Sequence, residues 1–318
     1  MSITLGIVMD PIQTIKPHKD SSLGLLLAAQ QQGWSLVYME MKDLMLDQEV
    51  PKALMCPLKV WDSPHHWFEL KNPSIRALSD LSVIMIRKDP PVDSAYLHAL
   101  QILEKANQNR VPVINNPSSL LHYNEKLLAL CFPEYVPPTL VTQSLDQAHQ
   151  FVLDHRDVIV KPLDGMGGES VFRIQKGDPN QQVIFETLSK RQEGYFLVQR
   201  YIPEIQAGDK RIILIDGQPM PYGLARLPKS GETRANLARG GKGIAVPLNE
   251  KDLEICHQVG PFVKEKGLLW VGLDVIGPYL TEVNITSPTC VREIEAQTNI
   301  NINAQLIKCI LHHINPTP

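Results

Sequence analysis

The sequence predicts an α/β fold with a parallel sheet over residues 1–120, followed by an α+β arrangement that is rich in hairpins. In the first part, short apolar runs that suit strands alternate with stretches that suit helices, which is typical of parallel sheets. From Val158 onward, strand-like runs follow one another across short turns. The chain has 318 residues, more than one hydrophobic core usually serves, so we expect two or three lobes.

Four strand-like runs and two helical stretches make up the first part. The runs lie at residues 3–9, 34–40, 81–87 and 111–114, and the helical stretches at residues 21–33 and 95–109. Ser22 is placed to cap the first helix and Gly33 to end it. Ligands gather at the carboxyl ends of parallel strands, where Arg87, Lys88 and Asp89 stand. The stretch GIVMDPIQT has one glycine where a dinucleotide fingerprint needs three, which disfavours a Rossmann dehydrogenase.

Two boundaries, near residues 120 and 202, divide the chain into predicted lobes at residues 1–120, 121–202 and 203–318. In the middle lobe we expect helices at residues 115–132, 144–155 and 179–192, and strands at residues 136–142, 158–162, 169–174 and 195–202. The last lobe begins with an apolar run at residues 210–220, which we expect to form one strand.

The composition excludes several classes of protein. Hydrophobic residues make up 43% of the chain, charged residues 20%, and the net charge of −3 gives no basic field for nucleic acid. The longest apolar runs fall short of the roughly 18 residues that span a membrane, and the first residues lack the basic region of a signal peptide. Five scattered cysteines without a CxxC pair indicate reduced thiols. We therefore expect a cytoplasmic protein with no membrane or nucleic-acid partner.

A glycine-rich stretch, VKPLDGMGGESVFRI at residues 160–174, lies between two strand-like runs. It is not a Walker-type loop, because no lysine follows the last glycine and no helix follows the loop. A plain hairpin turn is the alternative to a phosphate cover. Lys161 points away from its apolar neighbours towards whatever the loop covers, and Lys126 offers a second ammonium group. These lysines favour a cover over phosphates, as in kinases. The next run, FLVQRYI at residues 196–202, is apolar and suits either a strand that lines an adenine-binding pocket or a strand of the hydrophobic core.

The stretch GLLWVGLDVIGPYLTEVN at residues 267–284 predicts a metal site. Asp274 lies in an apolar strand, where an unpaired carboxylate is costly. Glu282 and Asn284 face the same side of the returning strand because they are two residues apart. If Asp274 stands opposite Glu282, two carboxylates and an amide oxygen converge, a set that suits Mg²⁺. The alternative is that nearby arginines satisfy the carboxylates.

The residues after this hairpin predict an anion site. Ser287 and Thr289 precede an apparent helix, whose N-terminus suits a substrate carboxylate, and Arg292 can bind one bidentately. Cys290 has no histidine base beside it, so we expect a packing residue. The stretch at residues 225–243 has four glycines and five cationic residues without apolar periodicity, which predicts a lid over an anionic site.

Taken together, these motifs resemble bacterial glutathione synthetase, a family of ATP-grasp ligases. The resemblance rests on VKPLDGMGG, GLDVIG with LTEVNITSPT, RKDPP, NEKL and GETRANLARGGKG, and it extends from LGIVMDP to at least REIEA. It implies an ATP-grasp fold behind a Rossmann-like N-terminal domain. It also implies a homotetramer or homodimer.

The resemblance implies a role for each candidate residue. ATP would be bound by Lys126, Lys161, Gly165, Met166, Gly167, Gly168, Gln199, Tyr201 and Ile202. Magnesium, with Mn²⁺ as an alternative ion, would be bound by Asp274, Glu282 and Asn284. Phosphoryl charge would be stabilised by Arg211, Arg226 and Arg234, and the substrates would be contacted by Arg87, Arg234, Asn236, Ser287, Thr289 and Arg292. One departure is the sequence VQRYI, where many ATP-grasp enzymes have a glutamate at the adenine hinge, and it leaves Arg200 without a role.

The implied reaction joins γ-glutamylcysteine to glycine with ATP, through an acyl phosphate, and gives glutathione, ADP and phosphate. Two alternatives stay open: another ATP-grasp carboxylate–amine ligase, of the D-alanine–D-alanine or glutamate-adding type, and a non-catalytic ATP-binding regulator. The RKDPP and GETRANLARGG motifs argue against the first because nucleotide binding alone does not require them. The complete phosphate and metal sets argue against the second.

Overall fold

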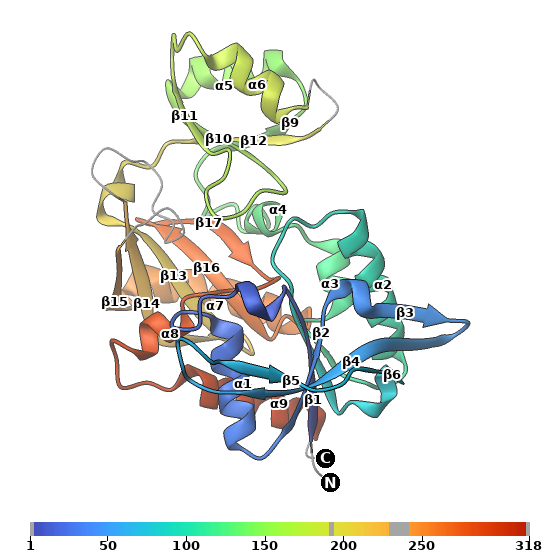
Figure 1. Cartoon of the computed structure of the whole chain (residues 1–318). Helices are drawn as coiled ribbons and strands as arrows, with labels where there is room; N and C mark the ends of the chain where they lie inside the picture. The colour runs from blue at the N-terminus through green and yellow to red at the C-terminus, as the bar shows by residue number, and fades with distance from the viewer. Residues whose placement is uncertain (1–2, 191–193, 229–241, 316–318) are drawn as a thin grey trace.

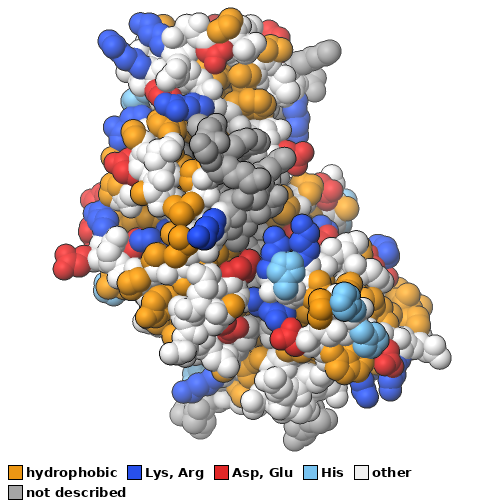
Figure 2. All heavy atoms as spheres, turned by 60° about the vertical axis from the view of Figure 1, so that its left-hand side comes forward, with side chains coloured by type: hydrophobic (Ala, Val, Ile, Leu, Met, Phe, Trp, Pro, Cys, Tyr) orange, Lys and Arg blue, Asp and Glu red, His pale blue; other side chains and the backbone are white. Residues whose placement is uncertain are grey.

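The computed structural model describes residues 3–190, 194–228 and 242–315. Figure 1 shows the N-terminal sheet and the C-terminal sheet side by side, with a smaller lobe above them. The described helices include none that is long and apolar enough to cross a membrane. On the face that Figure 2 shows, acidic and basic side chains are interspersed.

The N-terminal sheet has eight strands, in the order β3-β4-β2-β1-β7-β8, with β5 and β6 also paired to β4. Its strands are β1 (Thr4–Met9), β2 (Ser35–Met39), β3 (Leu44–Asp47), β4 (Val50–Val60), β5 (Phe68–Leu70), β6 (Ser74–Ala77), β7 (Val83–Arg87) and β8 (Val113–Ile114). The four strands β2, β1, β7 and β8 are parallel, which confirms the predicted parallel sheet. The antiparallel additions β3 to β6 were not predicted.

Helices cover both faces of this parallel core. Helix α1 (Ser21–Gln31) packs on the face that carries Leu5 and Ile7, while α2 (Ser94–Gln108) packs on the face that carries Val8 and Ile84. The short 3-10 helices η1 (Ile12–Thr14), η2 (Met41–Asp43) and η3 (Leu78–Asp80) lie between strands.

The cap of α1 differs from the prediction. Asp20 accepts a hydrogen bond from Leu23 N and caps the helix, whereas Ser22 is buried and accepts a hydrogen bond from Arg87. Gly33 follows the helix with a φ of 78°, a left-handed conformation that glycine adopts without strain, so the predicted end of the helix is confirmed.

The small lobe is a four-stranded antiparallel sheet, in the order β11-β10-β12-β9, with two helices packed on one face. It contains β9 (Thr139–Thr142), α5 (Leu145–His155), β10 (Asp157–Pro162), β11 (Phe172–Gln175), α6 (Gln181–Leu188) and β12 (Phe196–Arg200). Two short helices, α3 (Pro117–His122) and α4 (Glu125–Ala129), precede it in place of the single helix expected at residues 115–132.

The C-terminal sheet is antiparallel, in the order β15-β14-β13-β16-β17. Its elements are η4 (Pro203–Ala207), β13 (Asp209–Ile215), β14 (Gln218–Leu227), β15 (Lys242–Pro247), α7 (Glu250–Glu265), β16 (Trp270–Ile276), β17 (Tyr279–Asn284), α8 (Val291–Glu295) and α9 (Ile302–Ile314). The expected strand at residues 210–220 is two strands, because Asp216 and Gly217 have φ values of 50° and 75° and form a tight hairpin turn.

Part of the predicted lid is strand. Residues 225–227 belong to β14 and residues 242–243 to β15, and these strands pair with each other. Residues 229–241, which include Arg234 and Asn236, lie outside the described residues.

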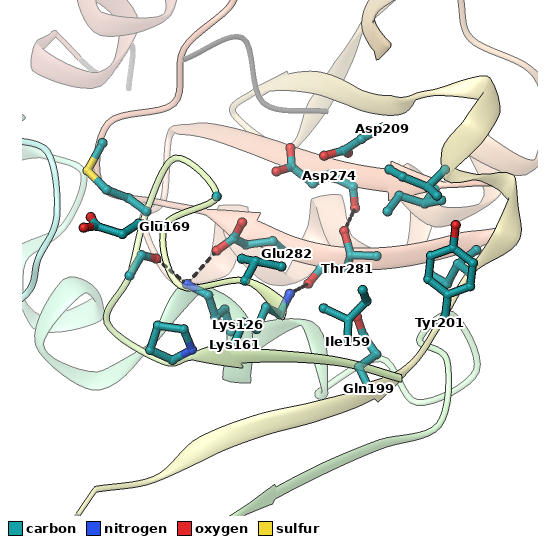
Figure 3. Close-up of a pocket in the computed structure, with 18 of the residues that line it drawn as sticks. Lys126, Ile159, Lys161, Glu169, Gln199, Tyr201, Asp209, Asp274, Thr281 and Glu282 are labelled. Carbon is teal, nitrogen blue, oxygen red and sulfur yellow. Dashed lines mark hydrogen bonds and ion pairs between the residues drawn. The ribbon is translucent and has the colours of Figure 1, made fainter. Parts of the chain in front are cut away.

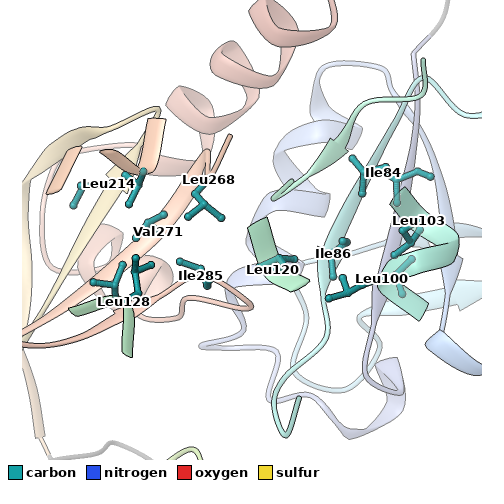
Figure 4. Packing of buried hydrophobic residues seen from close by; sticks show 14 of the residues in the cluster. Ile84, Ile86, Leu100, Leu103, Leu120, Leu128, Leu214, Leu268, Val271 and Ile285 are labelled. Carbon is teal, nitrogen blue, oxygen red and sulfur yellow. The ribbon is translucent and has the colours of Figure 1, made fainter. Parts of the chain in front are cut away.

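Two hydrophobic cores join the N-terminal and C-terminal sheets. One combines Ile84 and Leu100 of the N-terminal sheet and its helix with Leu214 and Val271 of the C-terminal sheet. Figure 4 shows Leu120 and Ile285 between these two groups of side chains. The C-terminal helix α9 packs on α1 in the other core, so the last element of the chain covers the N-terminal sheet. These shared cores fix the two sheets relative to each other.

We expect the substitution Gly260→Ala to destabilise the fold, although alanine is the better helix former by about 1 kcal/mol. A Cβ atom at Gly260 of α7 would lie 2.2 Å from the carbonyl oxygen of Gly217, a backbone atom that cannot rotate away. We predict a loss of about 1–3 kcal/mol, measured by urea unfolding. Gln258→Ala, at an exposed position of the same helix, is the control and should be neutral or stabilising. An increase in stability for Gly260→Ala would contradict this packing.

Candidate functional site

Two adjoining cavities lie where the lobes meet. The first is bounded by the glycine hairpin (residues 163–171), β12, β16 and β17. The second is bounded by the same hairpin, the segment after β17, and the residues after β1 and β7. Met166, Gly167, Asp274 and Glu282 line both cavities, so a ligand in one is adjacent to a ligand in the other.

The predicted residues divide between the cavities by their expected roles. The first cavity is lined by all the residues expected for ATP, namely Lys126, Lys161, Gly165, Met166, Gly167, Gly168, Gln199, Tyr201 and Ile202. The second is lined by Arg211, Arg226, Asp274, Glu282, Asn284, Ser287 and Thr289.

The glycine stretch is a hairpin between the antiparallel strands β10 and β11, as predicted. Gly167 and Gly168 have φ values of 61° and 75°, so this turn favours residues without a Cβ atom. On β10, Val158 and Val160 are buried in the small-lobe core, whereas Lys161 lines the cavity. The alternation of the strand therefore directs the lysine towards the space that the hairpin covers.

The two lysines converge on β17 beneath the hairpin (Figure 3). Lys126 Nζ donates to Gly165 O at 2.7 Å and forms an ion pair with Glu282 at 3.1 Å, and Lys161 Nζ lies 3.5 Å from Thr281 O. Burial lowers the pKa of Lys161. Burial has the same effect on Lys126, but the Glu282 carboxylate outweighs it and raises the pKa of Lys126.

The opposite end of the first cavity is apolar and aromatic. Figure 3 shows Gln199 and Tyr201 there, across the cavity from Lys126. The Arg173 guanidinium lies 3.7 Å from the centre of the Tyr201 ring, which fixes that ring at the wall. Arg200, to which the sequence assigned no role, donates to Tyr279 Oη at 2.8 Å and links the small lobe to the β16–β17 hairpin.

A β-bulge aligns the predicted metal residues. The turn between β16 and β17 pairs Ile276 with Tyr279 and Val275 with Leu280. The register then shifts by one residue at Thr281, so that Asp274 stands opposite Glu282 and Gly272 opposite Asn284. The predicted register is therefore confirmed, and the bulge supplies the odd residue that it requires.

Asp274 is paired with two arginines, the alternative that the sequence left open. Arg211 Nε lies 2.5 Å from one carboxylate oxygen, and Arg226 Nη2 lies 2.9 Å from the other. Burial alone would raise the pKa of Asp274, but the two guanidinium groups hold it well below its usual range. The carboxylate is therefore ionised and still lines both cavities.

The donor set at this position fits a hard cation. Within the described residues, no group of three or more His, Cys, Asp or Glu side chains could hold a metal ion. The predicted set has two carboxylates and one amide, and all three line the second cavity. Asn284 donates Nδ2 to Gly272 O at 3.2 Å, which leaves its Oδ1 to accept a ligand.

Two arginines predicted to contact substrate are not in the cavity lining. Arg87 is buried, donates to Pro288 O at 2.8 Å and Ser22 Oγ at 3.0 Å, and lies 3.9 Å over the Trp270 ring. Arg292 donates to Pro17 O and Asp62 Oδ1, each at 2.6 Å. Both guanidinium groups brace loops around the second cavity.

Sequence reasoning missed several acidic residues of the cavities, and three of them have surroundings that bear on the site. Asp209 is bound by Arg226 at 2.6 Å, and its other oxygen is buried without a partner among the described residues. Glu293 of α8 also has a buried oxygen to which no residue in the described part of the chain is hydrogen-bonded, and burial raises its pKa. Glu125 lines the second cavity beside Lys126. The two-residue spacing between Asp209 and Arg211, which puts both on one face of β13, was the available signal for the first.

Two family models match the chain. The model described as "Prokaryotic glutathione synthetase, N-terminal domain" matches residues 3–120, and the model described as "Prokaryotic glutathione synthetase, ATP-grasp domain" matches residues 125–299.

Curated relatives match over nearly the whole chain. A glutathione synthetase of Pseudomonas aeruginosa is 52% identical over 310 residues, which covers 98% of each chain. A glutathione synthetase of Vibrio vulnificus is 50% identical over 310 residues, with the same coverage.

Solved structures share the fold at low identity. A crystal structure of D-cycloserine synthetase DcsG superposes with a TM-score of 0.70 at 14% identity, covering 98% of this chain and 100% of that one. A RimK domain ATP-grasp protein from Sphaerobacter thermophilus has a TM-score of 0.63 at 13% identity, covering 96% of this chain and 98% of that one. These likenesses support the ATP-grasp fold that the sequence predicts.

Cys290 lines the second cavity, but we expect it to be an unreactive thiol. Burial raises its pKa, and burial raises the pKa of Cys256 to about 12, so both thiols stay protonated at pH 8. Cys131 is free and exposed. Iodoacetamide at pH 8 should therefore label Cys131 and spare the other two, as read by peptide mass mapping. Cys131→Ser is the control, and rapid labelling of Cys290 would contradict its inert character.

Proposed function

Because the chain belongs to the prokaryotic glutathione synthetase family, we propose that it uses ATP to join γ-L-glutamyl-L-cysteine to glycine. The products are glutathione, ADP and phosphate. The observation that carries this proposal is the pair of adjoining cavities, one lined by the residues expected for ATP and the other by residues expected for the peptide. Asp274 and Glu282 stand in the wall that the two cavities share.

The reaction proceeds in two steps. First, a carboxylate oxygen of γ-glutamylcysteine attacks the γ-phosphorus of ATP, and the bond from that phosphorus to the ADP oxygen breaks, which gives an acyl phosphate. The amine of glycine then attacks the acyl carbon, the carbon–oxygen bond to phosphate breaks, and the nitrogen loses a proton as the amide forms. Neither step needs a covalent protein nucleophile, so catalysis is mainly positioning and charge stabilisation.

The cationic side chains match the places where negative charge develops. We assign Lys126 and Lys161 to the phosphates of ATP, because both ammonium groups lie beneath the glycine hairpin. We assign Arg211 and Arg226 to the transferred phosphoryl group, because both line the second cavity next to Asp274. Arg234 keeps its proposed role in phosphoryl transfer, and Asn236 its proposed substrate contact.

Magnesium, with Mn²⁺ as an alternative ion, is the cation we assign to Asp274, Glu282 and Asn284. When bound, such an ion neutralises charge between phosphate oxygens. Two features of the structure suit these side chains to binding such an ion. The arginines hold Asp274 ionised, and Asn284 is oriented by its hydrogen bond to Gly272.

The donor peptide is assigned to the second cavity. Ser287 and Thr289 line it, although Ser287 Oγ donates to the Asp89 carboxylate and Thr289 Oγ1 lies 3.5 Å from Arg211. Arg87 and Arg292 are assigned an indirect role, since their guanidinium groups brace the loops of this cavity.

The organisation of the protein completes the proposal. We propose a substrate domain at residues 1–120, a small ATP-grasp lobe at residues 121–202 and a large lobe at residues 203–318. We also propose a cytoplasmic homo-oligomer, a dimer or a tetramer, which light scattering would distinguish.

The first test is ADP release with Mg-ATP, γ-glutamylcysteine and glycine, omitting each in turn. ADP should form only when all three are present, together with a product of the mass of glutathione. If no ADP forms with these substrates but ADP forms with D-alanine, the chain is a ligase of another specificity. ATP binding without turnover for either pair would favour a non-catalytic regulator.

The substitution Glu282→Gln should lower turnover at least about 100-fold and leave the fold intact, because it removes one of the two carboxylates assigned to the Mg²⁺ ion that stabilises the phosphate charge. Product formation and the melting temperature should be measured together. Glu254→Gln, an exposed glutamate on α7, is the control for loss of a charge. Near-normal turnover of Glu282→Gln would remove this residue from the site.

A further inference from the structure

Glu125 occupies a position that links the two cavities. It is the first residue of α4, directly before Lys126, and the Asn124 side chain caps that helix by accepting hydrogen bonds from Lys126 N and Leu127 N. The orientation of this helical turn is therefore fixed. Lys126 extends into the first cavity, whereas Glu125 lines the second.

One oxygen of Glu125 accepts three hydrogen bonds from the segment after β17. Ile285 N donates to Oε1 at 2.8 Å, and Thr286 donates to it through both N and Oγ1, each at 2.9 Å. This carboxylate therefore anchors the segment firmly to α4.

The same segment adjoins a residue assigned to the metal and carries residues assigned to the donor peptide. It follows Asn284 directly and includes Ser287 and Thr289. Other groups brace it from the N-terminal part of the chain, since Asn115 Nδ2 donates to Ile285 O at 2.7 Å and Arg87 donates to Pro288 O at 2.8 Å. Glu125 differs from these because its own helical turn carries Lys126.

Placing the carboxylate of Glu125 at this buried position also costs free energy. Burial raises the pKa of Glu125, and the nearby negative charge of Glu282 raises it further. Buried acidic side chains that are kept against such a cost are found mainly at functional sites.

We propose that Glu125 is a positioning residue that fixes the spacing between Lys126 and the segment at residues 285–289, which directly follows Asn284. The inference rests on the proposed function, because it assigns Lys126 to ATP phosphates and the segment to the donor. Through Glu125, one helical turn sets both the phosphate contact and the position of the carboxylate that attacks.

Loss of the Glu125 side chain should lower kcat much more than it weakens substrate binding. Each cavity keeps its own contacts when Glu125 is removed, so the KM values should change little. The alignment between the attacking oxygen and the γ-phosphorus should suffer, and a misplacement of about 1 Å can lower a rate about 100-fold.

The test compares Glu125→Ala, Glu125→Gln and Thr286→Val in the glutathione assay. We expect Glu125→Ala to lower kcat about 100-fold with the KM values for ATP and γ-glutamylcysteine within about threefold of the wild type. Glu125→Gln should restore kcat to within about fivefold, because its amide oxygen can accept the same hydrogen bonds. Thr286→Val should lower kcat a few-fold in the otherwise wild-type protein. It should have no effect when Glu125→Ala is already present, because the hydrogen bond from Thr286 Oγ1 to Glu125 is then already lost.

Binding and stability measurements separate positioning from structure. Titration calorimetry with Mg-ADP and thermal unfolding should give wild-type values for Glu125→Gln, and Glu265→Ala, an exposed glutamate, is the matched control for loss of a charge. A kcat for Glu125→Ala within threefold of the wild type would overturn the proposal, as would a kcat for Glu125→Gln no higher than that for Glu125→Ala. So would a loss of activity in Glu125→Ala that is matched by loss of Mg-ADP binding. A wild type that makes no glutathione would instead overturn the proposed function and the inference together.

Discussion

The site depends on one buried cluster of charges at the centre of the C-terminal sheet. Asp274 on β16 stands opposite Arg211 on β13 and opposite Glu282 on β17, while Asp209 on β13 stands opposite Arg226 on β14. Three strand pairings therefore place two guanidinium groups against two carboxylates on one face. A slip of one residue in any pairing would turn these charges into the apolar core. Since one unpaired buried charge costs about 3–5 kcal/mol, the register and the site are fixed together.

This cluster also explains why the arginines do not argue against a metal. A carboxylate with no partner in an apolar strand would take up a proton, and a protonated Asp274 would be a poor ligand. The arginines keep its pKa low, so the group stays anionic at the pH at which a cation binds. The sequence presented arginine pairing and metal binding as alternatives, whereas the arginine pairing that the structure shows is compatible with the proposed metal site.

The sequence was informative where the determining contacts are local. The glycine hairpin and the direction of Lys161 follow from the turn sequence and strand alternation, and both are present. The register of Asp274 with Glu282, which the sequence left conditional, depends on a β-bulge that turn length does not predict. Arg87 and Arg292 could not be placed in this way, because their partners are up to 275 residues distant in the chain. Local patterns also gave no warning of β3 to β6, because β3, β5 and β6 are only three or four residues long and the longer β4 contains Pro51 and Pro57, which are unusual inside a strand.

The shared wall between the cavities constrains the chemistry of the proposed reaction. Asp274 and Glu282 line both cavities, so a γ-phosphate held at these residues borders the donor cavity directly. An intermediate carried on the protein would need a nucleophile in that wall, and Cys290, which lines the second cavity, is buried with a raised pKa. Direct transfer from ATP to the donor carboxylate needs no such group, only a fixed distance between the two ligands. The hydrogen bonds of Glu125 to Ile285 and Thr286 supply that kind of constraint, because they join the phosphate side of the wall to the donor side.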